Sequence, residues 1–466
     1  MIQPQKTACL QTISPVDGSV YVERPLASER DIEQSIALSR LAQRQWQATD
    51  LETRAGICER AVQYFESNRE RIGEEITWQM GRPIAFSGGE IKGLAERARH
   101  MISVARHALA DNVPSAQEGF VRFIRRDPLG IVFTIAPWNY PLLTTVNSVV
   151  PALMAGNSVL LKPSAQTPLC GEHFVKAFQA AGLPEGVLQC LHLSHDNTSK
   201  IIREASVDFV CFTGSVAAGQ HIEQVAAGTF LGLGLELGGK DPAYVRADAD
   251  LDYAVAELVD GAFFNSGQSC CGIERIYVHE ALYSRFVEAY VEKVKTYKLA
   301  SPLLSDTNLG PMVKTQSADW VRKQISAAIA QGATSCIDPS LFVNSQPGTP
   351  YLAPQVLTDV NHTMSVMREE SFGPVVGIMS VDNDEEALQL MNDSDLGLTA
   401  SLWTRDAEQA EVLGDRLQTG TVFMNRCDYL DPALAWTGIK NTGRGATLSE
   451  LGYLQLTRPK SFHFKT

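Results

Sequence analysis

The chain lacks the features of a secreted, metal-binding or membrane protein. Its nine cysteines are an odd number, lie scattered between positions 9 and 427, and form no C-x-x-C pair near histidines. This pattern excludes a disulfide framework and a zinc site, so we expect no bound metal and a reducing cytoplasm. Residues 1–6 have no continuous apolar core, and no apolar run is long enough to cross a bilayer. We therefore expect no signal peptide and no contact with a membrane.

Positive charge is also scarce. The chain has 40 lysines and arginines against 53 aspartates and glutamates, which gives a net charge of −13. Because nucleic-acid binding needs a basic surface to neutralise phosphates, we expect no nucleic-acid partner. Apolar residues make up 44% of the 466 residues, as in ordinary globular proteins, and the chain is too long for one core. Without repeats, low-complexity tracts or long linkers, it is expected to form roughly two to four closely packed domains.

The spacing of apolar residues predicts the order of the elements. Residues 31 to about 110 have helical spacing, and 120–126 alternate like an exposed strand. Short continuous apolar runs, separated by helical segments, follow at 130–136, 158–162, 207–213 and 233–237. A second set lies at 275–278, 355–357, 375–379, 401–403 and 421–424. Such runs are typical of parallel strands buried on both faces, so we predict an α/β protein whose first unit is a doubly wound nucleotide-binding domain.

Polar and small residues follow the strands of the first set. Asn139 stands between two prolines, where a rigid backbone can hold its amide as a donor to an oxyanion. Lys162 ends the next strand, a position from which a lysine reaches a ribose or phosphate of a nucleotide. Gly214 and Ser215 form a strand-to-helix turn that suits a pyrophosphate. Each feature alone is equally typical of an ordinary turn or a solvated surface.

Two further residue types indicate covalent catalysis. Glu236 lies in an apolar strand before two glycines, where burial raises the pKa of a carboxylate toward that of a general base. The loop FFNSGQSCC at 263–271 presents a cysteine pair among small and polar residues. Backbone N–H groups of such a loop can face a sulfur and an oxyanion. Taken singly, a surface glutamate and cysteines that fill the core explain these residues as well.

Together and in this order, these motifs resemble the NAD(P)-dependent aldehyde dehydrogenase superfamily over nearly the whole chain. The resemblance continues through the motifs at 310–311, 369–374 and 438–440. It implies a Rossmann-like cofactor-binding domain, an α/β catalytic domain and a small β oligomerisation element. We expect these to comprise 1–110 with 129–237, 238–451, and 111–128 with 452–466. Sheet edges of the small element would pair between subunits, so we expect a homodimer or homotetramer.

The resemblance also implies roles for individual residues. Cys270 is expected to be the nucleophile and Glu236 the general base, whereas Cys271 only packs. Asn139 and the Cys270 backbone N–H would form the oxyanion hole. The residues expected to bind NAD or NADP are Lys162 at the adenosine ribose, Ser215 at the pyrophosphate, Glu370 and Phe372 at the nicotinamide ribose, and also Trp138, Ser164, Ala165, Gly214 and Leu237.

The sequence departs from the family pattern at two places. Many relatives that prefer NAD have a glutamate three residues after the strand-end lysine, where this chain has Ala165, so we expect NADP to be tolerated or preferred. In many relatives, a lysine and a glutamate linked to proton release occupy the positions of Ser148 and Thr447. Both charges are missing here, as expected for a coupled buried pair. We therefore expect a different proton route, or one through water.

The implied reaction is oxidation of a small-molecule aldehyde to a carboxylate through a thiohemiacetal and a thioester that activated water hydrolyses. In the loop at 425–432, Asp428 and Asp431 favour a cationic aminoaldehyde, whereas Arg426 favours a semialdehyde, and solvated loop charges are a further explanation. Small aliphatic, amino- and semialdehydes therefore all remain candidate substrates. Two alternative functions also remain: transfer of the acyl group to coenzyme A, and a non-catalytic binding protein that retains the fold.

Overall fold

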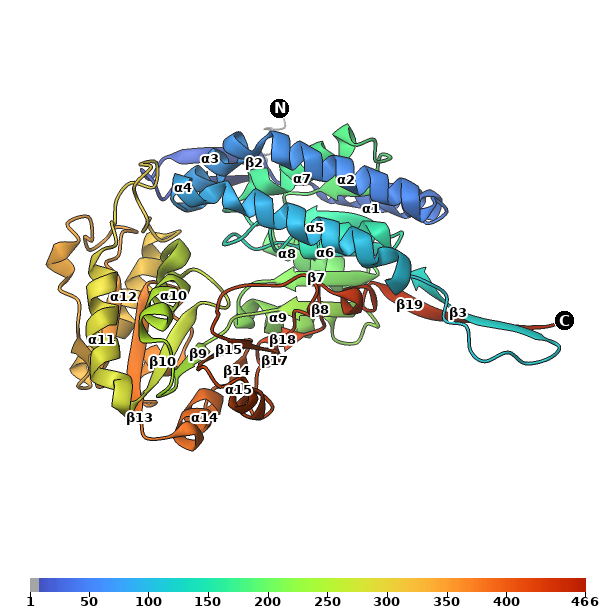
Figure 1. Ribbon diagram of the computed structural model, residues 1–466. Helices are drawn as coiled ribbons and strands as arrows, with labels where there is room; N and C mark the ends of the chain where they lie inside the picture. The colour runs from blue at the N-terminus through green and yellow to red at the C-terminus, as the bar shows by residue number, and fades with distance from the viewer. Residues whose placement is uncertain (1–7) are drawn as a thin grey trace, which may run out of the picture.

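The computed structural model describes residues 8–466, so residues 1–6, from which we expect no signal peptide, lie outside the described part. Two parallel sheets with helices packed against them form two α/β units, and a two-stranded ribbon projects from the body (Figure 1). Within residues 8–466, no helix is long and apolar enough to cross a membrane.

The chain adds strands to the first sheet in one direction from β4 (Ile131–Ile135) and then in the other. The order of this sheet is β18 (Gly443–Arg444), β8 (Gly232–Glu236), β7 (Phe209–Thr213), β4, β5 (Ser158–Lys162) and β6 (Leu188–Cys190), and only β18 is antiparallel to its neighbour. The chain passes from β4 to β5 and β6 on one side, and then to β7 and β8 on the other. A crevice opens at the carboxyl ends of the strands where winding reverses, which is where such sheets bind ligands.

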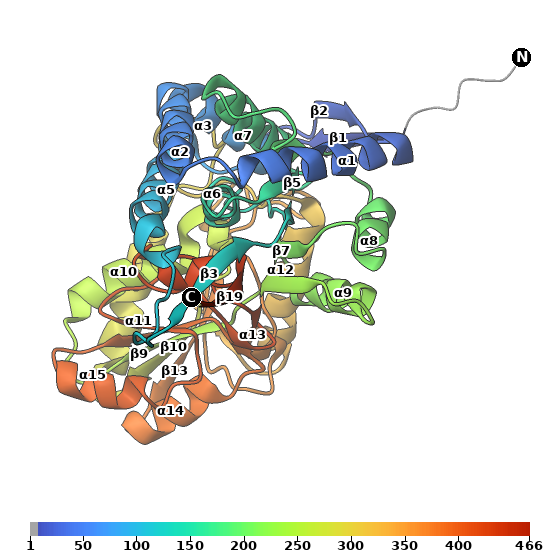
Figure 2. The same ribbon diagram turned by 90° about the vertical axis from the view of Figure 1, so that its right-hand side faces the viewer.

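Helices cover both faces of this sheet and bury its apolar runs. One face packs against α1 (Glu29–Trp46), α8 (His195–Arg203) and α9 (Val216–Ala226), and the last two lie together in Figure 2. The other face packs against α2 (Leu51–Ser67), α3 (Arg69–Met80), α5 (Gly89–Ala108), α6 (Val146–Met154) and α7 (Pro168–Ala180). The short α4 (Ile84–Ser87) and the hairpin of β1 (Cys9–Ile13) and β2 (Val20–Pro25) complete this unit.

The second sheet has the order β11 (Thr334–Ser335), β12 (Gln355–Thr358), β13 (Val375–Val381), β10 (Ile273–His279), β9 (Asp241–Val245), β15 (Thr399–Trp403) and β16 (Thr421–Met424). Only β11 is antiparallel to its neighbour. Its helices are α10 (Leu251–Phe263), α11 (Glu280–Lys295), α12 (Thr315–Ala330), α13 (Ser365–Arg368), α14 (Asp384–Asn392) and α15 (Ala407–Gly414). The 3-10 turns η1 (Phe264–Gly267) and η2 (Pro339–Leu341) and the bridge of β14 (Leu396–Gly397) with β17 (Ile439–Lys440) belong to the same part of the chain, whereas η3 (Glu450–Tyr453) packs on α5 and α6.

The projecting ribbon pairs β3 (Phe120–Pro128) with β19 (Thr457–Lys465) in antiparallel register. The strand expected at 120–126 is therefore present. Phe123 and Phe462 stack across the pair with ring centres 4.4 Å apart. Cross-strand aromatic contacts of this kind stabilise a ribbon that has little core of its own.

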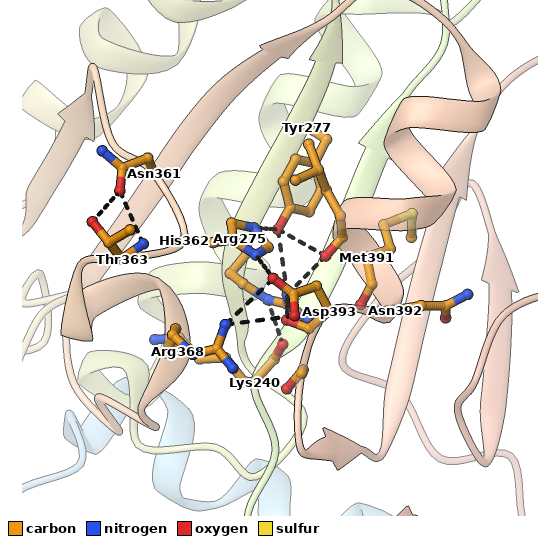
Figure 3. A network of polar contacts seen from close by, with 12 residues as sticks. Lys240, Arg275, Tyr277, Asn361, His362, Thr363, Arg368, Met391, Asn392 and Asp393 are labelled. Carbon is orange, nitrogen blue, oxygen red and sulfur yellow. Dashed lines mark hydrogen bonds and ion pairs between the residues drawn. The ribbon is translucent and has the colours of Figure 1, made fainter.

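A buried arginine joins the second sheet to the turn that follows the first (Figure 3). Arg275, in β10, donates from Nε to the Lys240 carbonyl at 2.9 Å and from Nη2 to the Met391 carbonyl at 3.1 Å. Its neighbour Tyr277 has its hydroxyl 2.7 Å from His362 Nε2. Since buried guanidinium groups are stable only when hydrogen-bonded, these contacts fix the backbone directly after Gly238 and Gly239.

Candidate active site

A cleft of about 710 Å³ opens at the carboxyl ends of β4, β5 and β7. Its volume is in the range of about 300–1,000 Å³ that is usual for small-molecule sites. Of the residues predicted from the sequence, all but Glu236 line this cleft: Trp138, Asn139, Lys162, Ser164, Ala165, Gly214, Ser215, Leu237, Cys270, Glu370 and Phe372. Residues from both units thus meet in one site.

One end of the cleft suits a polyanion. Ser215 caps the N-terminus of α9, and its side chain accepts from the Ala218 N–H at 3.3 Å. Lys162 is buried, its Nζ is 3.3 Å from the Pro163 carbonyl, and burial lowers the pKa of its ammonium group. Among the described residues that line the cleft, Glu370 is the only acidic one, against two lysines and two histidines. Helix N-termini and basic side chains are what a dinucleotide phosphate binds.

The Glu370 carboxylate lies against the glycine turn after β8. It accepts from the Gly239 N–H at 3.1 Å, and burial, followed by the charge of Glu274, raises its pKa to about 8. Nearby, the rings of Trp138 and Phe372 meet edge to face with centres 5.6 Å apart. These three side chains form the end of the cleft that is nearer to Cys270.

Sequence reasoning missed the carboxylate that holds this loop. Glu274, in β10, accepts from the backbone N–H groups of Ser371 and Phe372, both at 2.9 Å, and forms a buried ion pair with Lys240. It fixes the backbone directly after Glu370 and, through Lys240, the turn that follows Gly239. The sequence contains no clear signal of it, because the same strand also has Arg275 and His279.

The cysteine loop has an unusual backbone. Asn265, Ser266 and Gly267 have φ values of 54°, 57° and 71° in succession. A Cβ atom on Gly267 would lie 2.3 Å from the Gly373 carbonyl oxygen, so only glycine fits there. The left-handed turn brings the Gln268 carbonyl to 3.2 Å from Asn139 Nδ2, which places the predicted oxyanion donor against the cysteine loop.

A buried ion pair, which sequence reasoning also missed, supports both the Asn139 segment and the cysteine loop. Arg82 and Glu90 pair with each other, and each is 2% exposed. Arg82 donates to the Asn139 carbonyl and, from Nε, to Asn265 Oδ1 at 3.2 Å. Glu90 Oε1 accepts from the Leu142 N–H at 2.6 Å. One ion pair therefore ties the Asn139 segment to the cysteine loop.

The two adjacent cysteines differ in environment. Cys270 is partly exposed and lines the cleft, whereas Cys271 is buried and donates from Sγ to Asp428 Oδ1 at 2.9 Å. Its hydrogen bond with Cys270, then burial and the Asp428 charge, raise the pKa of the Cys271 thiol well above its usual value. Burial likewise raises the pKa of Asp428, to about 6. A thiolate at neutral pH is therefore disfavoured at Cys271.

Glu236 lies at the end of β8, behind the cleft. Its carboxylate accepts from the Thr447 hydroxyl at 2.5 Å and from the Thr213 hydroxyl at 3.2 Å. Burial raises the pKa of Glu236, as its apolar strand predicts, and the two hydroxyls oppose that rise. A Cβ atom on Gly239 would lie 2.3 Å from the Cys270 carbonyl oxygen, so the end of this strand approaches the cysteine loop closely.

A small cavity of about 20 Å³, with several polar side chains in a mostly apolar lining, adjoins Glu236. Ser148 and Thr447, the two positions where the sequence departs from its relatives, both line it, and it extends toward Arg444 and Gln455. The Ser148 hydroxyl is 3.1 Å from the Thr134 hydroxyl. A cavity of this size has room for one water molecule.

Of the three charged residues in the loop at 425–432, Arg426 and Asp428 have different surroundings. The Arg426 guanidinium lies over the Tyr429 ring, 3.4 Å from its centre, and the Tyr429 hydroxyl donates to Glu96 at 3.0 Å. Asp428 instead accepts from the Ser269 hydroxyl at 2.8 Å, directly beside Cys270. Of the two, Asp428 is the one attached to the cysteine loop.

Comparison with known proteins agrees with this geometry. The model of the aldehyde dehydrogenase family matches residues 2–462. The chain belongs to the aldehyde dehydrogenase family. The family and the α/β fold predicted from the sequence are thereby confirmed.

Several relatives of the chain in this family have different substrates in their names. It is 34% identical to succinate semialdehyde dehydrogenase (NAD(P)+) Sad of Escherichia coli (strain K12), with 95% of each chain covered. It is 32% identical to benzaldehyde dehydrogenase YfmT of Bacillus subtilis (strain 168), covering 97% of this chain and 92% of the relative. A crystal structure of NADP-dependent glyceraldehyde-3-phosphate dehydrogenase from Bacillus halodurans C-125, complexed with NADP, superimposes with a TM-score of 0.92 at 30% identity, covering 98% and 96%.

Proposed function

We propose that this aldehyde dehydrogenase oxidises an aldehyde to a carboxylate with NAD or NADP, through an acyl-enzyme on Cys270. The observation that carries the proposal is the junction of the cleft-lining Cys270 with Asn139 on one side and the glycine turn after the Glu236 strand on the other. A nucleophile, an oxyanion donor and a base in that arrangement suit acyl transfer.

The first half of the reaction uses the cysteine loop. Cys270 Sγ attacks the aldehyde carbon, a C–S bond forms, and the carbonyl oxygen becomes an oxyanion that the Asn139 amide and the Cys270 N–H stabilise. Cys271, buried and bonded to Asp428, keeps its proton and packs beside the nucleophile. Because Arg82 holds both Asn139 and Asn265, the donor and the nucleophile keep a fixed relative position.

The cleft fits a dinucleotide cofactor, since basic side chains and the N-terminus of α9 line it. We propose that Lys162, Ser164 and Ala165 contact the adenosine ribose, and Gly214 and Ser215 the pyrophosphate. The nicotinamide end would meet Trp138, Leu237, Glu370 and Phe372. The bound cofactor supplies the acceptor for the hydride that leaves the thiohemiacetal carbon.

Glu236 acts in the second half of the reaction, which is hydrolysis of the thioester. As a general base it takes a proton from water, the hydroxyl adds to the thioester carbon, and the C–S bond breaks to release the carboxylate and the Cys270 thiolate. The proton then leaves through the water-sized cavity lined by Ser148 and Thr447. A base in this position favours hydrolysis over transfer to coenzyme A, and the intact set of Cys270, Glu236 and Asn139 argues against a non-catalytic protein.

The substrate classes inferred from the sequence are small aliphatic, amino- and semialdehydes. Two of the three relatives described act on carboxylated or phosphorylated aldehydes by their names, which supports an anionic substrate. With Ala165 exposed, and Glu370 the only acidic residue that lines the cleft among those described, NADP is expected to bind as well as NAD or better.

The variant E236Q tests the mechanism. It should still form about one reduced cofactor per active site in a rapid burst, followed by turnover much slower than that of the wild type, because only thioester hydrolysis needs the base. The variant C270A should show neither phase. A wild-type turnover rate in E236Q contradicts the role of Glu236, and a product that appears only with coenzyme A supports the acylating alternative.

A further inference from the structure

Arg97 is a buried arginine without an ion-pair partner among residues 8–466. It lies in α5 and is 8% exposed. Its printed contacts are both from Nη1, to the Leu143 carbonyl at 2.7 Å and to Asn147 Oδ1 at 3.5 Å. An uncompensated buried charge is costly, so a guanidinium in this state indicates a missing anion.

Three other buried cations of the molecule are compensated. Arg82 pairs with Glu90, and Lys240 pairs with Glu274. Arg275 has no carboxylate partner, but it donates to the carbonyls of Lys240, Leu390 and Met391, as Figure 3 shows for Lys240 and Met391. In Arg97, Nε and Nη2 have no hydrogen-bond acceptor within the described residues. Arg97 is therefore the one of these four that still offers donors.

Asn147 adds a second free donor at the same place. It is 2% exposed, and its Oδ1 is turned toward Arg97, which can only donate. This orientation leaves Nδ2 buried without a partner in the part of the chain that the structure describes. A guanidinium and an amide NH₂ group side by side, with no acceptor for either, match the oxygen atoms of a carboxylate.

These donors lie close to the reacting groups. Asn147 lines the same small cavity as Glu236 and belongs to α6, which follows Asn139 in the chain. Burial lowers the pKa of Arg97, and the charges of Glu236, Cys271 and Cys270 oppose that shift, in this order. Glu236 itself is bonded to Thr447 and Thr213 and makes no hydrogen bond to Arg97 in residues 8–466. The carboxylate is thus not supplied by the catalytic base.

We propose that Arg97, with Asn147, binds the distal carboxylate of a semialdehyde substrate. The inference rests on the proposed function and narrows its substrate class to aldehydes with a carboxylate at the far end. Arginine suits this role because its planar fork stays charged when buried and binds both carboxylate oxygens. Arg97 is then a specificity residue, since it contacts the part of the substrate that does not react.

The position of Asp428 predicts a substrate of the opposite charge. Its carboxylate adjoins the cysteine loop and would attract a cationic aldehyde, although Ser269 and Cys271 already donate to its Oδ1. A panel of substrates distinguishes the preference predicted from Arg97 from the one predicted from Asp428. Its members are succinate semialdehyde, butanal and 4-trimethylaminobutanal, which share a four-carbon chain and carry a negative, neutral and positive end.

In the wild-type enzyme, kcat/KM should be highest for succinate semialdehyde and should exceed that for butanal on the order of tenfold to a hundredfold, the effect of one charge-assisted contact. A value for butanal equal to or above that for succinate semialdehyde overturns the proposal, and so does a preference for 4-trimethylaminobutanal. Absence of turnover with every aldehyde would instead contradict the proposed function, so the two failures are distinguishable.

The variant R97M tests the residue itself. The ratio of kcat/KM for succinate semialdehyde to that for butanal should fall on the order of tenfold or more, mainly through KM, and R97K should retain part of it. R106M is the matched control, since Arg106 lies exposed on the same helix and pairs with Glu52. An equal loss with both substrates in R97M overturns the assignment. If R97M does not fold, R97K and the wild-type panel still decide it.

Discussion

The Thr447 hydroxyl donates to Glu236 Oε1 at 2.5 Å, at the position where many relatives have a glutamate. This contact stabilises the charged form of a carboxylate whose pKa burial raises. The family's acidic side chain is thus replaced by a neutral donor that acts on the base directly. Together with Ser148 it lines the small cavity through which we propose that the proton leaves.

Removing this hydroxyl should shift the pH profile. In T447V the pKa of Glu236 rises, so a larger share of the base is protonated, and the acid limb of kcat moves to higher pH. At pH values below the new midpoint, kcat should fall on the order of tenfold, as expected for the loss of one hydrogen bond to a charged group. The measurement is kcat against pH, with T447S as the conservative variant. An unchanged profile in T447V, or failure of T447S to restore it, contradicts the argument.

The Arg82 and Glu90 pair predicts a stability effect. The variant E90Q leaves the Arg82 guanidinium buried without its counter-charge, which should lower the free energy of unfolding by about 3–5 kcal/mol. It should also lower kcat, because Arg82 holds the Asn139 segment. Denaturant unfolding of E90Q, R82M and the double variant checks this. If the pair is coupled, the double variant loses less than the sum of the single ones.

These supporting residues show where sequence reasoning ends. Apolar runs predicted the main strands of both sheets, because buried parallel strands have a simple pattern. They missed β9, whose first residues Asp241 and Pro242 do not look like a central strand. The order of motifs led to Cys270, Glu236 and Asn139 through the family resemblance, and the domain boundary expected at 237/238 stays a prediction.

Residues whose hydrogen-bond partners lie far away in the sequence cannot be recognised from the local sequence pattern. Glu274 lies 97 residues from Ser371, whose N–H it accepts, and Arg82 lies 183 residues from Asn265. Nothing in the sequence near either residue distinguishes it from a surface charge. Arg97 was missed for the same reason: in the sequence it is one of several basic residues of a helix, and only burial without a partner sets it apart.

Ala165 should control the choice of cofactor. Its side chain is exposed at the cleft, so a longer residue fits without repacking. In A165E a carboxylate would repel a 2′-phosphate and bond the ribose hydroxyls of NAD, and the ratio of kcat/KM for NADP to that for NAD should fall on the order of tenfold or more. A165Q is the neutral control of equal size. A wild-type enzyme with a large preference for NAD would contradict the expectation.

The ribbon of β3 and β19 is proposed to assemble the subunits into a homodimer or homotetramer. It projects from the body (Figure 1), and its two strands pair with each other, while β3 has in addition only short bridges to Asn112 and Gln117 among residues 8–466. Val121 and Phe464 face each other across the ribbon and are 48% and 52% exposed, although both are apolar. Unpaired strand edges beside exposed apolar side chains are where another copy adds.

Charging that face should therefore reduce the assembly. In the double variant V121K/F464K, the repulsion between copies should lower the molar mass in light scattering, from a dimer or tetramer to a smaller species. Arg416 and Glu385 form an exposed ion pair, and Glu385 lies in α14, which packs on the second sheet, so R416Q serves as a control for a surface charge change. Since neither lysine lies at the cleft, a loss of cofactor binding in V121K/F464K would indicate that assembly supports the site. A wild-type chain that is monomeric at all concentrations contradicts the proposed role of the ribbon.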